Sequence, residues 1–242
     1  MFTRTESFRS FLRFYPIISI IVAIHIILWL LINSSLPLGD TLAQQMVGFN
    51  FLIAEGEYWR LITPIFVHGG FGHMLFNSFS LILFGPALER MMGKVKFIVA
   101  YIFAGVIANI ATYYFEPLNF AHVGSSGAIF GLFGIYLYMV VIRKDLIDQA
   151  NSQLIMTILV IGLIMTFINS NVNIIAHIFG FVAGAIIAPL LLPKRSLSHQ
   201  PLSTFNRSVG ERKRIQIPRE FSPKHIVWLI IIILVIIGII YK

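Results

Sequence analysis

The sequence predicts an all-α polytopic membrane protein, a helical bundle with seven transmembrane segments. Hydrophobic residues make up 57% of its 242 residues, charged residues make up only 12%, and the mean hydropathy is +0.86. Soluble domains carry roughly twice that share of charged residues, about 25%. The apolar residues gather in stretches about as long as a helix needs to cross the hydrocarbon layer. The chain has no cysteine, which excludes a disulfide framework and a thiolate metal site.

Seven apolar segments follow one another along the chain. They are Pro16–Ile32, Phe71–Leu88, Phe97–Phe115, Gly124–Ile142, Leu154–Ile168, Ile174–Leu192 and Ile226–Tyr241. This pattern divides the chain into an N-terminal stretch 1–15, a six-helix core 16–193, a basic linker 194–225 and a C-terminal seventh helix 226–242. The seventh segment is almost pure Ile, Leu and Val, so we expect it to be an appended anchor that faces lipid.

One long connection, residues 33–70, separates the first two segments. It contains Trp59 and several other apolar residues, which make it too apolar for a solvated linker. We expect short interfacial helices that lie on the bilayer, with Tyr58 and Trp59 at the depth of the lipid headgroups. The linker 194–225 is polar and basic, which is typical of a flexible cytoplasmic connection in contact with anionic lipid.

The distribution of positive charge predicts the orientation of the chain. If the apolar segments cross the membrane in turn, 16 of the 18 Lys and Arg residues fall on one side, and only Arg60 and Lys242 fall on the other. The positive-inside rule then places the N-terminus in the cytoplasm and the C-terminus outside. The net charge of +8 is explained by this asymmetry, so we expect no nucleic-acid partner. A bacterial cytoplasmic membrane is the expected location.

A serine and a histidine in two of these segments are candidates for chemistry. Gly124-Ser125-Ser126-Gly127 lies at the entrance of the fourth segment, and the sixth carries His177. Both lie near the outer end of their segments. An ionisable residue inside a membrane is a candidate for function, and a serine nucleophile needs a base within hydrogen-bond reach. Two simpler interpretations stay open: one of the serines only caps the helix, and His177 is a packing histidine.

Glycines on the same two segments favour close helix packing. Gly127, Gly131 and Gly134 share one face of the fourth segment, and Gly180 and Gly184 lie on the His177 face of the sixth. Such faces let membrane helices approach closely, which a Ser–His hydrogen bond between helices requires. The same glycines also fit generic membrane packing.

The second segment adds two polar residues, His73 and Asn77. Their four-residue spacing places both side chains on one helical face near the same outer surface. Such donors suit the stabilisation of an oxyanion, and interhelical hydrogen bonding is the simpler alternative. The fourth and sixth segments contain no Asp or Glu, which favours a Ser–His dyad over a triad. There is no His-Glu-x-x-His metal motif and no pair of membrane aspartates, so we expect no metal and no cofactor.

Together these motifs resemble the rhomboid family of intramembrane serine proteases over about residues 10–193. Four motifs carry the resemblance, in order: Trp59-Arg60 in the first loop, His73-x-x-x-Asn77, Gly124-Ser125-Ser126-Gly127, and Ala176-His177-x-x-Gly180-x-x-x-Gly184. The chain departs at Phe130, where some members of the family have a tyrosine stacked on the catalytic histidine. Phenylalanine keeps the stacking and loses the hydroxyl.

The resemblance implies a rhomboid-like bundle of six core helices with one C-terminal extra helix, and a role for each site residue. Ser126 would be the nucleophile and His177 the general base and acid. His73 and Asn77, with the backbone N–H of Ser126, would stabilise the oxyanion. Structural support would come from Trp59, Arg60, Gly124, Gly127, Phe130, Gly131, Gly180 and Gly184.

The implied substrates are transmembrane proteins. A membrane helix has all its backbone groups hydrogen-bonded, so a cleavable one must first unwind, and we expect helix-weakening residues near its outer end. Two other classes stay open: a catalytically inactive rhomboid-like chaperone or scaffold, and a transporter or channel. The absence of an evident internal repeat weighs against many transporter architectures.

Overall fold

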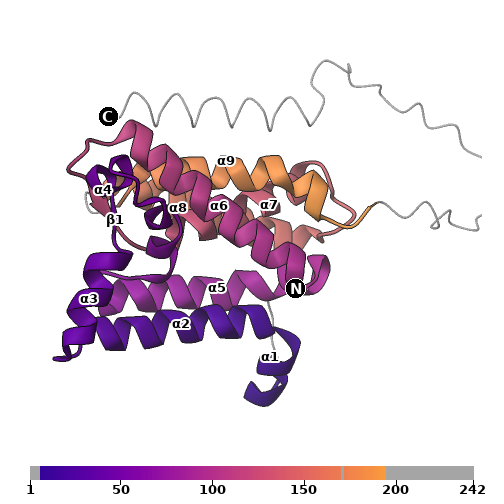
Figure 1. The fold of residues 1–242 in the computed structure, drawn as a ribbon. Coiled ribbons are helices and arrows are strands. Elements are labelled where there is room, and N and C mark those ends of the chain that lie inside the picture. Colours follow the sequence, from indigo (N-terminus) through magenta and orange to yellow (C-terminus); the bar gives the residue numbers. More distant parts are fainter. Residues whose placement is uncertain (1–5, 170–171, 195–242) are drawn as a thin grey trace, which may run out of the picture.

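The computed structural model describes residues 6–169 and 172–194, and in this part it is a bundle of helices (Figure 1). A short helix α1 (Phe8–Phe14) leads into α2 (Pro16–Ile32) through a bend of 108°. The remaining long helices are α5 (Phe71–Met92), α6 (Lys94–Phe115), α7 (Ser126–Val141), α8 (Gln149–Ile168) and α9 (Ile174–Leu191). Among the described helices, α5, α6, α8 and α9 are long and apolar enough to cross a membrane.

The six predicted core segments correspond to α2, α5, α6, α7, α8 and α9, and the bounds of α2 agree with the prediction. The larger of the other differences lie at polar ends, where a helix continues past its apolar stretch. Helix α8 begins at Gln149 and not at Leu154, because the Asp148 side chain accepts a hydrogen bond from the backbone N–H of Asn151 at 2.9 Å. The predicted seventh segment, 226–242, lies outside the described residues.

Helices α6, α7 and α9 pack tightly against one another around the glycines of α7 and α9. A Cβ atom on Gly180 would overlap the backbone carbonyl of Gly127, and one on Gly184 would overlap that of Gly131. The two backbones therefore touch over two helical turns. Where α6 meets this contact, a Cβ on Gly131 would overlap the side chain of Ala104 in α6 and lie 3.2 Å from the Gly180 carbonyl oxygen. The predicted packing face is confirmed as a contact between α7 and α9.

We expect Gly184→Ala to lower the stability of the bundle by about 1–3 kcal/mol, because the added methyl group must push the two backbones apart. Gly72→Ala is the matched control, since Gly72 is also helical and a Cβ there meets no atom within 4 Å. Thermal unfolding in detergent measures both. Equal melting temperatures for the two variants would contradict the close α7–α9 contact.

Helix α2 packs on α5, and a buried carboxylate joins them. Glu89 of α5 is only 3% exposed, and its two carboxylate oxygens accept hydrogen bonds from the backbone N–H groups of Ile17 and Ile18 at 3.0 and 3.1 Å. These N–H groups belong to the first turn of α2 and have no partner within the helix. Glu89 therefore caps α2 from a neighbouring helix, a role that the sequence analysis did not predict.

The long loop folds into the predicted short helices. They are α3 (Pro37–Met46), α4 (Asn50–Ala54), η1 (Tyr58–Leu61) and η2 (Thr63–Phe66). Strand β1 (Gly48–Phe49) pairs antiparallel with β2 (Ala121–His122), which precedes α7. The backbone N–H of Gly124 also donates to the carbonyl of Pro64 at 2.9 Å. The loop is therefore attached directly to the segment that leads into Ser126.

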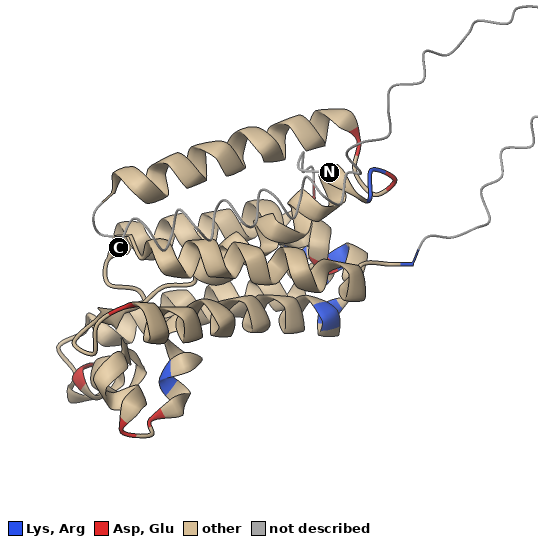
Figure 2. Ribbon diagram, turned by 90° about the horizontal axis from the view of Figure 1, so that it is seen from above, with Lys and Arg blue, Asp and Glu red and all other residues tan. Residues whose placement is uncertain are grey.

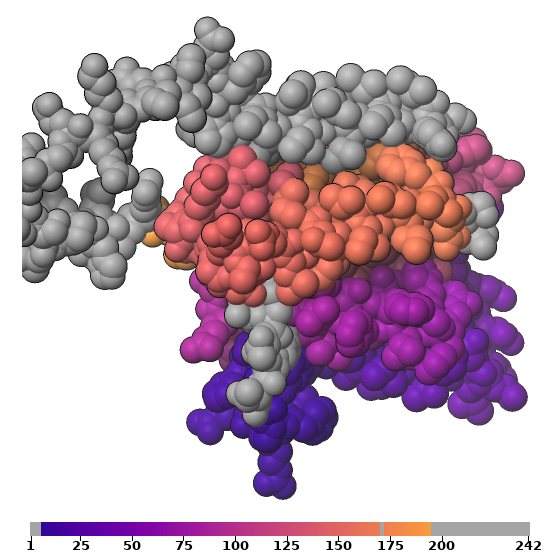
Figure 3. Space-filling view, turned by 180° about the vertical axis from the view of Figure 1, so that it is seen from behind, coloured from indigo at the N-terminus to yellow at the C-terminus, as the bar shows by residue number. Residues whose placement is uncertain are grey.

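Charge and exposure distinguish the surfaces of the bundle. In the described part, the charged residues gather at the helix ends and in the loops, and the helix flanks between them carry none (Figure 2). Helix α8 lies at the periphery, and its outer side forms part of the face in Figure 3. Only 17% of the most apolar 18-residue stretch of α8 is buried, against 61% of the corresponding stretch of α9. It exposes Leu154, Val160, Ile161, Ile164, Met165 and Ile168.

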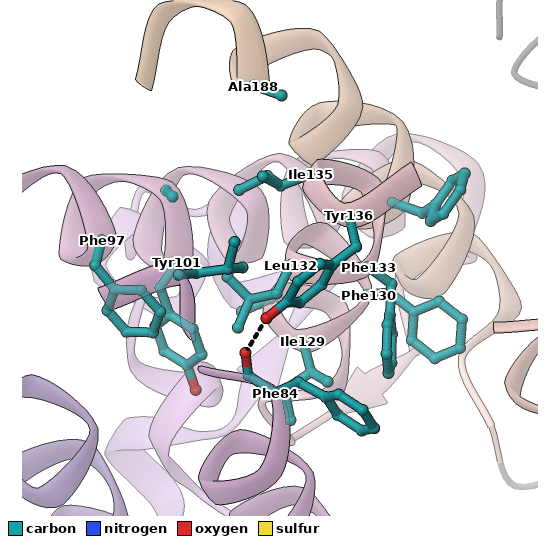
Figure 4. Packing of buried hydrophobic residues seen from close by; sticks show 14 of the residues in the cluster. Phe84, Phe97, Tyr101, Ile129, Phe130, Leu132, Phe133, Ile135, Tyr136 and Ala188 are labelled. Carbon is teal, nitrogen blue, oxygen red and sulfur yellow. Dashed lines mark hydrogen bonds between the residues drawn. The ribbon is translucent and has the colours of Figure 1, made fainter. Parts of the chain in front are cut away.

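The buried core centres on α7 and contains one internal hydrogen bond of note. The Tyr136 hydroxyl donates to the backbone carbonyl of Phe84 in α5 at 2.6 Å (Figure 4). Phe84 and Phe133 meet at a centroid distance of 4.9 Å beside it. Because a buried hydroxyl requires a partner, this bond fixes the register of α7 against α5.

Candidate active site

Ser126 is the first residue of α7, and the two serines of the motif differ in their surroundings. Ser125 is fully buried, and its hydroxyl lies 3.4 Å from Nε2 of His68. It precedes the helix but makes no capping hydrogen bond with its side chain. Ser126 is partly exposed and borders a small cavity. Of the two hydroxyls, that of Ser126 is therefore accessible to a ligand.

The cavity at Ser126 lies between α6, α7, α9 and the segment that leads into α7. It combines apolar walls with the polar side chains of Asn109, His122 and Asn173. Asn173 also fixes the start of α9: its amide nitrogen donates to Thr112 Oγ1 at 2.9 Å, and its amide oxygen accepts from the backbone N–H of Ala176 at 2.9 Å. The first turn of α9 is thereby held against α6.

His177 lies in this first turn of α9 and is 8% exposed. Its ring stacks on Phe130 at a centroid distance of 4.1 Å and an interplanar angle of 18°. The predicted stacking on phenylalanine is confirmed. Ser126 and His177 are chain neighbours of Gly127 and Ala176, and a Cβ on Gly127 would lie 3.4 Å from the Ala176 carbonyl oxygen. The two side chains thus come from adjoining points of the α7–α9 contact.

Among the described residues, the hydrogen bond of His177 goes to Thr166 and not to Ser126. Nδ1 of His177 lies 2.8 Å from Thr166 Oγ1 of α8. Catalytic hydrogen bonds in ligand-free enzymes are often long and shorten in the substrate complex. The sequence analysis missed Thr166. Its signal in the sequence is the helical spacing of Ile155, Leu159, Gly162 and Thr166, in which Thr166 is the polar member.

His73 and Asn77 of α5 lie together beside the backbone that precedes Ser126. A Cβ on Gly124 would lie 2.6 Å from His73 Nε2 and 3.6 Å from Asn77 Nδ2. Gly124 has a φ of +122°, which L side chains rarely adopt. Asn77 is 7% exposed, and its Nδ2 has no hydrogen-bond partner within the described structure. A buried donor without a partner is costly unless a ligand accepts its hydrogen bond.

A cluster of histidines supports this corner of the site. His68 is buried between His25 and His73, with ring centroids 4.6 and 5.1 Å away. Burial, with smaller contributions from the two neighbouring rings, lowers the pKa of His68, so that its ring is neutral. A neutral ring can contact Ser125 and two other imidazoles without charge repulsion. His68 is thus buried directly beside the serine motif.

Trp59 and Arg60 connect the parts of the long loop. The Trp59 indole donates to the Gln45 carbonyl at 3.2 Å. Arg60 is 2% exposed, its Nε pairs with Glu57 at 2.7 Å, and Nη1 donates to the carbonyls of Gln44 and Val47 at 2.8 and 2.7 Å. These bonds hold the end of α3 against η1.

Across the described ranges, no three His, Asp or Glu side chains are grouped to hold a metal ion.

His122 is half-buried, with both ring nitrogens buried, and we expect it to make the stability of the protein depend on pH. Burial lowers its pKa from 6.5 to about 4, and neither ring nitrogen has a hydrogen-bond partner in the described structure. Because the unfolded chain binds a proton more readily, the contribution of His122 is complete above pH 6.5 and is lost as the pH falls toward 4. We expect the melting temperature to fall more in the wild type than in His122→Phe between about pH 7.5 and about pH 4.5. Equal losses would contradict this assignment.

Known proteins that are similar to this chain show the family to which it belongs. The rhomboid domain family matches residues 55–194, which include the four motifs and the site. YdcA of Bacillus subtilis (strain 168) is 50% identical over 197 residues, covering 81% of this chain and 98% of that protein. The chain therefore belongs to the rhomboid family, and it is a multi-pass membrane protein.

Two further relatives are named as proteases. Rhomboid protease GluP of Bacillus subtilis is 36% identical over 178 residues, which are 72% of this chain but only 34% of GluP. Rhomboid-like protease 1 of Toxoplasma gondii is 29% identical over 199 residues, covering 76% of this chain and 67% of the relative. The chain thus spans about a third of GluP and most of YdcA.

Proposed function

We propose that this rhomboid-family protein is an intramembrane serine endopeptidase that cleaves transmembrane proteins near the outer face of the membrane. The observation that carries the proposal is the convergence of polar groups from α5, α7 and α9 at the start of α7. Relatives named as proteases support the same conclusion. An accessible serine, a histidine on the adjoining helix and an unpaired buried amide donor are the parts that acyl transfer requires.

In this proposal the chemistry proceeds in two steps. Ser126 Oγ attacks the scissile carbonyl carbon while His177 Nε2 takes its proton, and the carbonyl oxygen becomes an oxyanion. His73, Asn77 and the backbone N–H of Ser126 donate hydrogen bonds to that oxygen. His177 then gives its proton to the departing amine, leaving an acyl-enzyme. Water, activated by His177, attacks the ester and releases the carboxylic acid and the serine.

The substrate class follows from the place of the site. Ser126 begins a helix of the bundle and lies below a loop that the positive-inside rule places outside, with the N-terminus in the cytoplasm. A substrate helix has to unwind before its backbone carbonyl reaches Ser126. We infer that the substrates are membrane helices with Gly, Ala or other helix-weakening residues near their outer ends. Membrane lipids surround the flanks, and the reaction requires no metal, no cofactor and no nucleic acid.

Replacing the proposed dyad tests the function directly. We expect the wild type to cleave a reporter membrane helix in liposomes, and Ser126→Ala and His177→Ala to lose this cleavage, because nucleophile and base act as a unit. Ser152→Ala, on the first turn of α8, is the matched control and is expected to cleave normally. A fluorophosphonate should label Ser126 and not the buried Ser125, as read by mass spectrometry of the modified peptide.

Equal cleavage by all four proteins would point to a contaminating protease and contradict the proposal. A folded wild type that neither cleaves several reporter helices nor reacts with the fluorophosphonate would favour the catalytically inactive, scaffold-like alternative.

The unpaired amide of Asn77 makes a separate prediction. We expect Asn77→Ala to lower kcat by about 100- to 1,000-fold with little change in KM, because an oxyanion donor acts mainly in the transition state. Asn151→Ala, in the first turn of α8 and outside the site, is the control and should change neither constant. Steady-state kinetics on the same reporter helix measure both. A rise in KM at unchanged kcat would assign Asn77 to substrate binding instead.

A further inference from the structure

Thr166 of α8 contacts the proposed base from outside the three helices that carry the proposed chemistry. Its Oγ1 lies 2.8 Å from His177 Nδ1. Both residues are buried, with Thr166 1% and His177 8% exposed. Water therefore does not compete for this hydrogen bond, which in a low-dielectric interior is strong enough to orient a ring.

A second hydrogen bond of Thr166 determines which atom carries the proton in its contact with His177. Thr166 Oγ1 also lies 2.8 Å from the carbonyl oxygen of Gly162, one turn earlier in α8, and its hydroxyl hydrogen points to that oxygen. A hydroxyl has one hydrogen and two acceptor lone pairs. Toward His177, the Thr166 oxygen is therefore left as an acceptor, and the ring nitrogen that faces it has to carry the proton.

We propose that Thr166 is a positioning residue that holds neutral His177 in the Nδ1–H tautomer. Neutral imidazole carries one proton, so Nε2 is left with a free lone pair on the opposite side of the ring. This inference rests on the proposed function, in which Nε2 takes the proton of Ser126. After that transfer, Nδ1–H still donates to the same oxygen, so the ring does not have to reorient during turnover.

The surroundings of the ring explain why a neutral hydroxyl fills this position. A buried carboxylate orients the histidine of a catalytic triad, and α7, α8 and α9 contain no Asp or Glu. A hydroxyl that is itself bonded to a helix carbonyl needs no counter-ion in the membrane. It accepts one hydrogen bond in a fixed direction, which is sufficient to select a tautomer.

Helix α8 also lies beside Phe130, the residue that stacks on His177. A Cβ on Gly162 would lie 3.5 Å from Phe130 Cζ, which is an ordinary packing distance. Gly162 and Thr166 are one turn apart and share a face. One face of α8 therefore lies against the stacked partner of the imidazole and also carries Thr166, which contacts the imidazole directly.

Thr166→Val tests the proposal, because it keeps the β-branched shape and removes the acceptor. We expect kcat for a reporter helix to fall by about 10- to 100-fold at unchanged KM, the range expected for a lost hydrogen bond to an ionising group. Thr166→Ser should restore most of the rate. Thr157→Val is the matched control: Thr157 lies on the exposed side of α8 and bonds to the Gln153 carbonyl at 2.9 Å in the same way, but has no contact with His177.

Nitrogen-15 NMR of labelled histidine reads the tautomer without turnover. At about pH 8, above the ordinary titration range of histidine, His177 of the wild type and of Thr166→Ser should carry its proton on Nδ1. Thr166→Val should lose this preference, and His177→Gln assigns the signal by difference. A wild-type ring with its proton on Nε2 would overturn the proposal, as would full kcat in Thr166→Val or a Thr166→Ser variant as slow as Thr166→Val. An inactive wild type would instead contradict the protease function, and the spectrum would still decide the tautomer.

Discussion

The backbone contact between α7 and α9 is the constraint on which the site depends. Gly127 and Gly131 on one helix meet Gly180 and Gly184 on the other, and a single added methyl group at Gly180 or Gly184 would collide with a backbone carbonyl. Apolar burial drives little association between helices that already lie in lipid, so close packing of small residues has to supply it. In the proposed function, this contact is what brings the serine of one helix near the histidine of the other.

The remaining elements place their groups relative to that fixed pair. The hairpin of β1 and β2, together with the bond from Gly124 to Pro64, attaches the outer loop to the entrance of α7. The positive φ of Gly124 brings the chain under His73 and Asn77 of α5. Asn173 caps α9 and binds α6, which holds the first turn that carries His177. Rigid helix ends thus position the groups of the site, a more accurate arrangement than side chains on a mobile loop.

The sequence predicted the features that depend on local pattern. The helices could be predicted from the apolar segments because membrane spans are long and uniformly apolar. The α7–α9 packing face could be predicted because its small residues recur at every helical turn. His73 and Asn77 could be paired by their spacing on one helix. Contacts between segments far apart in sequence could not be predicted, because no periodicity reports them. The cap that Glu89 provides for α2, the burial of Ser125 against His68 and the bond from Thr166 to His177 are of this kind.

Two helices determine how His177 lies, and they differ in how tightly they are packed into the bundle. On one side the ring belongs to α9, which is locked to α7 through backbone contacts. On the other side its orientation depends on α8, whose most apolar window is only 17% buried and whose outer face is largely apolar and exposed. A helix so lightly packed has a low cost of local displacement. Moving it by a fraction of a turn would break the hydrogen bond of Thr166 and leave the α7–α9 contact intact. In the proposed mechanism, the position of the base and its protonated nitrogen are therefore set by different parts of the bundle: the first by the tightly packed glycine contact, the second by the peripheral helix α8.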